Sequence, residues 1–116
     1  MLKKENRLSS NFEFNIARKY GTHVEGDFSH IYFVTPKNYE GPTKVGVVVS
    51  NKLHKNAVVR NRIKRLYREA VRNSFDKINK GNLWVAIHPK FNSQDKTYEE
   101  INADFNKILQ KASFSN

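Results

Sequence analysis

The segment between residues 52 and 72 constrains the fold more than any other part of the chain, because it joins a helical apolar repeat to dense positive charge. From Ala57 onward, one helical arc collects the apolar residues Val59, Ile63, Leu66, Tyr67, Ala70 and Val71. At about 100° per residue, the opposite arc collects the basic residues Arg62, Arg65, Arg68 and Arg72. The pattern predicts a long helix that packs on a hydrophobic surface and leaves a cationic face outward.

Two further helices are predicted from capping boxes, in which a hydroxyl and a carboxylate three residues apart satisfy two orphan backbone N–H groups. Ser10 and Glu13 begin one helix, which Gly21 ends. Thr97 and Glu100 begin the last helix, which has an apolar stripe over residues 98–112 and is expected to fray over residues 112–116.

Alternation with a period of two predicts strands over residues 29–35, 44–50 and 83–88, with a further short strand near residues 22–25. Residues 37–42 connect the first two of these strands and end on the turn signal Gly41-Pro42, so we expect strands 29–35 and 44–50 to form a hairpin. Within the strand 29–35, this alternation places Tyr32 on one face and Ile31 and Phe33 on the other.

The apolar stripes of the three helices need a common surface to bury, and a sheet supplies it most economically. The sequence therefore predicts one α+β domain over residues 1–116, a sandwich of about four strands packed with three helices. Parallel pairing of the strands on either side of the long helix would give a βαβ crossover. Periodicity leaves both that pairing and the handedness open.

The charge of the basic segment indicates the class of partner. Residues 52–72 hold eight Lys and Arg against the single acidic residue Glu69, which is +7 of the chain's formal +10. Self-repulsion of this density is relieved by a polyanion whose counterions are released on binding, so we expect nucleic acid. A solvated polar helix face and an anionic membrane surface are the alternatives. Lys52, His54 and Lys55 extend the positive field into the preceding loop.

The composition limits both the compartment in which the protein is expected and the kinds of site that it can contain. The chain has no Cys, which excludes disulfides and thiolate sites, and no apolar run long enough for a membrane span or signal core, so we expect it in the cytoplasm. Its four His are scattered, no glycine-rich phosphate loop is present, and Glu99, Glu100 and Asp104 suit helix capping better than acid-base work. No side-chain active site and no metal site are predicted.

Aromatic residues form a second, weaker signal. Tyr32 lies opposite Ile31 and Phe33, and either Phe12 or Phe14 must point away from the main stripe of the first helix. Exposed rings of this kind stack on the bases of single-stranded RNA. The alternative, which is favoured residue by residue and applies to Trp84 as well, is that these rings belong to the core.

The run from Asn56 to Arg65, which contains Arg60-Asn61-Arg62-Ile63-Lys64-Arg65, followed by Arg68, resembles the signature of the bacterial ribonuclease P protein subunit. The resemblance covers nearly the whole chain. It includes the residues Asn6-Arg7-Leu8, Phe14, Tyr32 and Val45-Gly46-Val47. It implies a fold similar to domain 2 of ribosomal protein S5, with an unusual left-handed βαβ crossover.

The resemblance also implies a function, in which the protein assists a catalytic RNA that removes the 5′ leader from precursor tRNA, with Mg²⁺ acting with the RNA. The catalytic RNA would contact Lys52, Lys55, Asn56, Arg60, Asn61, Arg62, Lys64, Arg65, Arg68 and Arg72. The leader would lie in a cleft between the first helix and the sheet, which includes Phe14, Arg18 and Tyr32. No membrane and no obligate protein partner are implied.

Three positions depart from the family pattern. Lys55 stands where many members have Gly, Asn51 where Lys is frequent, and Arg18 where an aromatic residue often lines the cleft. A guanidinium can still stack on a base or bind a phosphate, so Arg18 remains compatible with the cleft. One competing function is a structural RNA-binding protein such as a ribosomal component, which the charge pattern alone permits equally well. Another is a nuclease that acts without RNA.

Overall fold

The computed structural model describes residues 2–112, so all but the first residue of the segment predicted to fray, residues 112–116, lies outside the described part. Within it, the helices are α1 (Asn11–Tyr20), α2 (Ala57–Ile78) and α3 (Tyr98–Lys111), with 3-10 turns η1 (Lys4–Asn6) and η2 (Phe91–Asp95). The strands are β1 (Thr22–Glu25), β2 (Ser29–Val34), β3 (Lys44–Val47) and β4 (Trp84–Pro89). Both predicted capping boxes are present, at Ser10 and at Thr97.

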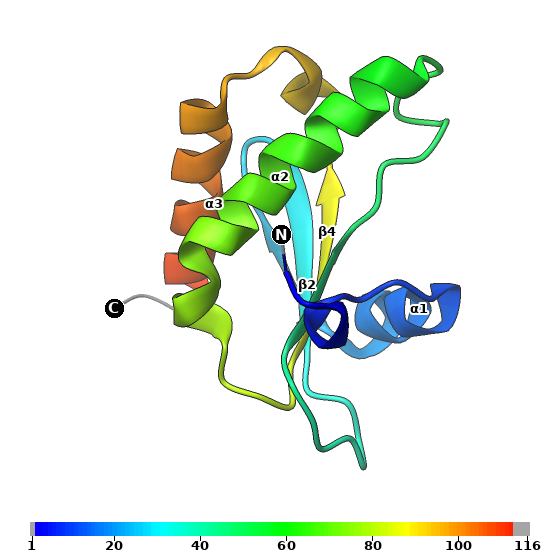
Figure 1. The fold of residues 1–116 in the computed structure, drawn as a ribbon, viewed down its shortest axis with the longest axis vertical. Coiled ribbons are helices and arrows are strands. Elements are labelled where there is room, and N and C mark those ends of the chain that lie inside the picture. The colour runs from blue at the N-terminus through cyan, green and yellow to red at the C-terminus, as the bar shows by residue number, and fades with distance from the viewer. Residues whose placement is uncertain (1, 113–116) are drawn as a thin grey trace.

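The four strands form one mixed sheet in the order β1-β2-β4-β3. β2 pairs antiparallel with both β1 and β4, whereas β3 and β4 run parallel on either side of α2, which confirms the βαβ unit and the short strand β1. In Figure 1, α2 lies in front of the sheet and β4 runs upward to the left of the green chain that carries β3. From β3 the chain passes through α2, in front of the sheet, to the parallel strand β4 on the left. With both strands pointing upward, this is a left-handed crossover.

The predicted hairpin between residues 29–35 and 44–50 is wrong, because β4 lies between β2 and β3. The chain before β3 is bonded to the turn before β4 instead of to β2. Asn82 N donates to Gly41 O over 2.7 Å, and Lys44 N donates to Leu83 O over 2.9 Å. These bonds align β4 beside β3, and β4, which is largely buried on both faces, fills the centre of the sheet.

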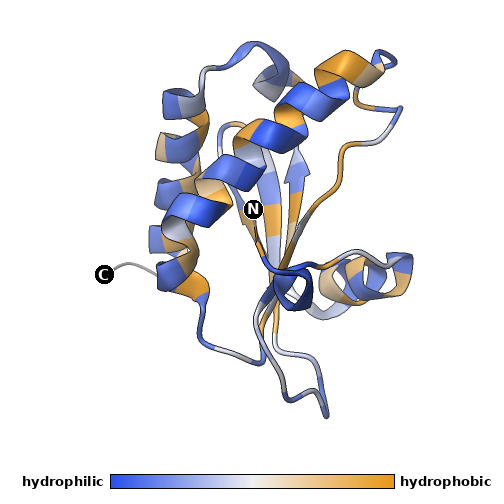
Figure 2. Ribbon diagram, viewed as in Figure 1, coloured by the Kyte–Doolittle hydropathy of each residue, from blue (hydrophilic) through white to orange (hydrophobic). Residues whose placement is uncertain are grey.

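Each face of the sheet packs against different helices. α2 and α3 cover the face that carries Ile31 and Ile87, and the largest fully buried side chains there are Tyr67 and Phe105. Figure 2 shows hydrophilic and hydrophobic residues alternating along α2 and α3, as expected for helices with one face on a core. On the opposite face, α1 is the only helix among residues 2–112 that packs on the sheet, and Tyr32 and His88 stay partly exposed there.

α1 approaches the sheet closely over Gly46 of β3. A Cβ at this position would lie 2.5 Å from Phe14 Cζ and 2.3 Å from Leu8 O, so only glycine fits without displacing the chain. Phe14 is consequently buried at 8% exposure together with Leu8. α1 is thereby fixed across β2, β3 and β4.

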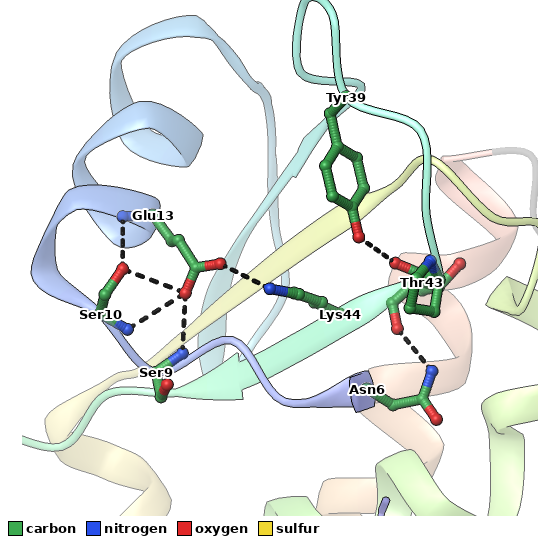
Figure 3. A network of polar contacts seen from close by, with 8 residues as sticks. Asn6, Ser9, Ser10, Glu13, Tyr39, Thr43 and Lys44 are labelled. Carbon is green, nitrogen blue, oxygen red and sulfur yellow. Dashed lines mark hydrogen bonds and ion pairs between the residues drawn. The ribbon is translucent and has the colours of Figure 1, made fainter. Parts of the chain in front are cut away.

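The N-terminal segment closes the outer edge of β3. Asn6 Nδ2 donates to Thr43 O over 2.8 Å, and Leu8 N donates to Val45 O over 3.0 Å, so residues 6–8 run along the strand like a short fifth partner. Figure 3 shows how Glu13 continues this contact into α1, since its carboxylate accepts from Ser9 N and Ser10 N and pairs with Lys44 Nζ at 3.0 Å. Covering an edge in this way blocks strand pairing with other chains.

Candidate nucleic-acid interface

The outer face of α2 carries cations that have no partner in the described part of the chain. Lys64, Arg65 and Arg68 make no hydrogen bond or ion pair with any residue between 2 and 112, and both arginines are exposed. Their charge is therefore not neutralised by a carboxylate. Guanidinium groups in this state bind phosphate through paired N–H donors.

Two other arginines of the predicted interface hold neighbouring segments in place. Arg60 Nη1 donates to the carbonyls of His54 and Lys55, each over 2.9 Å. Arg62 donates to Gln94 O over 2.7 Å and to Lys96 O over 3.0 Å, which ties α2 to η2. The Arg62 side chain thus leans toward η2, while Arg68 lies on the β3 side of the helix.

The remaining predicted residues surround this face. Asn56 caps α2 by accepting from Val58 N over 2.8 Å, and Arg72 forms an exposed ion pair with Glu69. The other predicted residues are exposed at the start of the helix and in its preceding loop: Lys52, Lys55 and Asn61. The structure therefore gathers all the predicted residues on one helix and one loop, and their contacts with RNA stay a prediction.

His88 of β4 is the centre of the second candidate surface, on the sheet face that α1 leaves partly open. Its ring lies edge-on to Tyr32 at a centroid distance of 5.4 Å and edge-on to Phe14 at 6.3 Å. Arg18 Nη1 lies 3.5 Å from His88 Nε2. The three residues predicted for the leader cleft thus converge on a histidine that the sequence did not single out.

A row of stacked rings extends this surface toward β1. His23 stacks on Tyr32 at 4.9 Å and on His30 at 5.0 Å between centroids. His23 Nε2 and His30 Nδ1 also share a hydrogen bond of 2.8 Å. We call His23, His30, Tyr32 and His88 the aromatic face. Strand alternation already placed His30 beside Tyr32, but only the antiparallel register, which pairs His23 with Tyr32 and His30 with His88, shows the cluster.

Two histidines of the aromatic face, His88 and His30, have lowered pKa values, which favours their neutral form at neutral pH. Burial lowers the pKa of His88 to about 4, and the charges of Arg18 and His30 act in the same direction. Burial also lowers the pKa of His30, although Glu25 partly opposes this. Neutral imidazoles at His88 and His30, beside the guanidinium of Arg18, suit the stacking of bases whose phosphates are bound nearby.

The depressed pKa of His88 predicts a loss of stability in acid. Between pH 6.5 and 4 the unfolded chain binds a proton that the folded chain excludes, so the free energy of unfolding should fall as the pH drops through this window. After a discount for the partial exposure of the ring, we expect about 1–2 kcal/mol. Urea denaturation at several pH values measures it. His88→Gln should flatten the dependence, whereas Thr35→Ala, an uncharged exchange at an exposed position, should leave it unchanged.

Acidic residues serve structural roles at the positions where the sequence suggested capping. Glu100 completes the capping box of α3, accepting from Thr97 N. Asp104 is buried and accepts from Asp27 N at 2.8 Å and Phe28 N at 3.0 Å.

Between residues 2 and 112, no three His, Asp or Glu side chains lie close enough to hold a metal ion. None of the helices in that range is long and apolar enough to cross a bilayer.

A mixed four-stranded sheet with a cationic helix on one face and a half-covered aromatic surface on the other defines a small basic α+β protein. Comparison with known proteins gives the family. A sequence model of the family described as Ribonuclease P matches residues 2–113. The ribonuclease P protein component of Finegoldia magna is 39% identical over 111 residues, which cover 95% of this chain and 93% of that protein.

Two further relatives agree. The ribonuclease P protein component of Fusobacterium nucleatum is 34% identical and covers 92% of this chain and 96% of that protein. The solved structure of the Staphylococcus aureus RNase P protein matches with a TM-score of 0.82 at 27% identity, over 97% of this chain and 100% of that one. The chain belongs to the ribonuclease P protein family. It is a subunit of a ribonuclease and has an RNA partner in that enzyme.

Proposed function

We propose that the outer face of α2 and the loop before it bind the catalytic RNA of ribonuclease P, while the aromatic face holds the 5′ leader of precursor tRNA. The observation that carries this proposal is a set of cations on α2 that make no hydrogen bond or ion pair among residues 2–112, namely Lys64, Arg65 and Arg68. The phosphates of a folded RNA would serve as anionic partners for these three side chains.

The aromatic face suits an unpaired strand better than a duplex. Its rings lie next to each other, so successive bases can stack on Tyr32 and His23. Arg18, beside His88, is placed to bind the phosphate that links two stacked nucleotides. Phe14 is largely buried and acts mainly by supporting His88.

In this proposal the RNA cleaves the bond, with Mg²⁺ supplying an activated water there. The described residues offer no cluster of ligands that would hold the ion, so we assign none of them to it. The protein contributes positive charge instead. Arg65 and Arg68 reduce the repulsion between two polyanions, and the aromatic face positions the leader. The site of action is expected to be the cytoplasm, where tRNA precursors are processed.

The proposal is tested by reconstituting the protein with its cognate ribonuclease P RNA and measuring cleavage of precursor tRNA. Adding the protein should lower the Mg²⁺ concentration needed for cleavage and tighten binding of precursor over mature tRNA. Tyr32→Ala should remove about 1–2 kcal/mol of that preference without changing affinity for mature tRNA. Thr35→Ala, at an exposed position after β2, serves as the control.

Two results would contradict the proposal. One is an unchanged Mg²⁺ requirement when the protein is present. The other is cleavage of precursor tRNA by the purified protein without RNA, which would place the chemistry on protein side chains. Co-purification with ribosomal subunits in place of the ribonuclease P RNA would favour a structural role in the ribosome.

A further inference from the structure

A pocket of about 200 Å³ opens between the N-terminal segment, β3 and α2. We call it the N-terminal pocket. Its interior is apolar, because Leu2 and Leu8 come from the N-terminal segment, Val45 and Val47 from β3, and Val71 from α2. The volume is below the roughly 300–1,000 Å³ of pockets for drug-sized ligands, so it suits one small ring system.

The rim of the pocket is cationic on two sides. Arg68 reaches it from α2 and has no partner among residues 2–112. Arg7 reaches it from the opposite side, where its Nε donates to Leu2 O over 3.0 Å. A ligand that fills the pocket therefore combines an apolar body with a negative charge at its mouth. A free phosphate would leave the apolar walls unused, and an uncharged apolar side chain would leave Arg68 unused.

The floor of the pocket also offers hydrogen-bonding groups. Leu8 N donates a hydrogen bond to Val45 O, so the carbonyl of Val45 points to the outer edge of β3. Backbone groups alternate sides along a strand, so the N–H and C=O of Val47 face the same edge as those of Val45. The bond from Leu8 does not involve them. Val47 lines the pocket. A planar ligand with donors and acceptors on its edge matches this arrangement.

We propose that the N-terminal pocket receives one unpaired nucleobase of the RNA that lies along α2. This inference rests on the proposed function and adds a site to it. The base lies between the apolar walls with its edge toward Val47, and its phosphate is bound by Arg68. Arg65, one turn earlier on the helix, then takes a neighbouring phosphate. An unstacked base held in this way fixes the register of the RNA on the protein, which phosphate contacts alone do not.

Ser9 provides a substitution that fills the pocket without changing charge. It is exposed at the rim, and its backbone N–H is held by Glu13 Oε1 at 3.3 Å, a bond that a new side chain leaves in place. With the cognate ribonuclease P RNA, Ser9→Trp should bind roughly 10-fold more weakly, the loss expected for one stacked base. Its salt dependence should match that of the unsubstituted protein, because no phosphate contact is removed. Ser9→Leu, a smaller filler, should give a smaller loss.

Chemical probing of the RNA locates the base directly. With dimethyl sulfate for A and C and a carbodiimide for G and U, the unsubstituted protein should protect the Watson–Crick edge of one unpaired base. At saturating concentration, Ser9→Trp should leave that base reactive, while Gln110→Trp, on the exposed side of α3, should protect it.

The possible failures are distinguishable. If the unsubstituted protein binds no ribonuclease P RNA, the proposed function fails and takes the pocket site with it. If it binds, but Ser9→Trp and Ser9→Leu bind with equal affinity and protect the same bases, only the pocket inference is overturned. Thermal melting of each variant verifies folding, and a folded Ser9→Leu keeps the test decisive if Ser9→Trp unfolds.

Discussion

Replacing both Arg65 and Arg68 with Ala is expected to weaken binding of the ribonuclease P RNA about 30-fold at 0.15 M salt, the largest functional effect we foresee. About five phosphate contacts give the intact protein a slope of roughly −4 in a plot of log affinity against log salt. Each arginine removed should flatten the slope by about one. Filter binding or fluorescence anisotropy across a salt series measures both quantities.

A charge-matched control separates this local effect from a change in net charge. Lys37, in the loop after β2, and Lys107, on α3, are exposed and make no hydrogen bond or ion pair among residues 2–112. The double substitution of these lysines with Ala removes the same charge and should leave the slope within about 0.5 of the original. A double arginine variant whose slope equals that of the intact protein would exclude both residues from the interface.

Asp104→Ala is expected to cost about 3 kcal/mol of unfolding free energy, the largest effect on stability among our predictions. The Asp104 carboxylate is 4% exposed and accepts two backbone N–H groups, from Asp27 and Phe28. These bonds join the turn between β1 and β2 to α3. Without the carboxylate, both partly buried donors lose their acceptor. Thermal melting should show a fall of about 10 °C.

Two further substitutions define the origin of that loss. Asp104→Asn keeps the shape but presents an amide N–H to one of the backbone donors, so about half of the loss should remain. Asp95→Ala removes an exposed carboxylate that lies 3.8 Å from Lys96 Nζ, and it should change the stability by less than about 0.5 kcal/mol. Equal stability of Asp104→Ala and the unsubstituted protein would show that the turn is held by other contacts.

The parts of the fold that depend on local chemistry could be predicted from the sequence. A capping box needs only four consecutive residues, so Ser10 with Glu13 and Thr97 with Glu100 located the starts of two helices. The period of apolar residues likewise identified α2 and the face on which Ile63 is buried. These signals contain their own partners within one or two turns of chain.

Strand neighbours could not be predicted in the same way. Period-two alternation tells which residues share a face, but it carries no information about which strand lies alongside. The expected hairpin followed from the short connection before β3. The structure instead pairs β3 with β4, a strand that begins 40 residues later at Trp84 and opposes Lys44. Side chains such as Asn82, which accepts from Gly41 N over 2.8 Å, decide this pairing at long range.

The candidate site was predicted in composition but not in detail. The cations of α2 were visible because they share one helix. Arg62 donates to the carbonyls of Gln94 and Lys96, which lie more than 30 residues further along the chain. The structural role of Arg62 could therefore not be predicted from the sequence. His88 was missed for a similar reason. Its contacts with Phe14, Arg18 and Tyr32 join three elements, which are brought together by the sheet register and by the packing of α1 on the sheet.

The position of β4 has a consequence for how the chain folds as it leaves the ribosome. β4 is an inner strand of the sheet, and it is also the last strand to be synthesised. Until residue 89 has emerged, the β1–β2 hairpin and β3 have no strand to join them, and the core that α2 covers cannot close. Two-stranded hairpins alone are marginally stable in water. Nascent chains that stop before Trp84 should therefore be protease-sensitive, and folding should be a late, cooperative event.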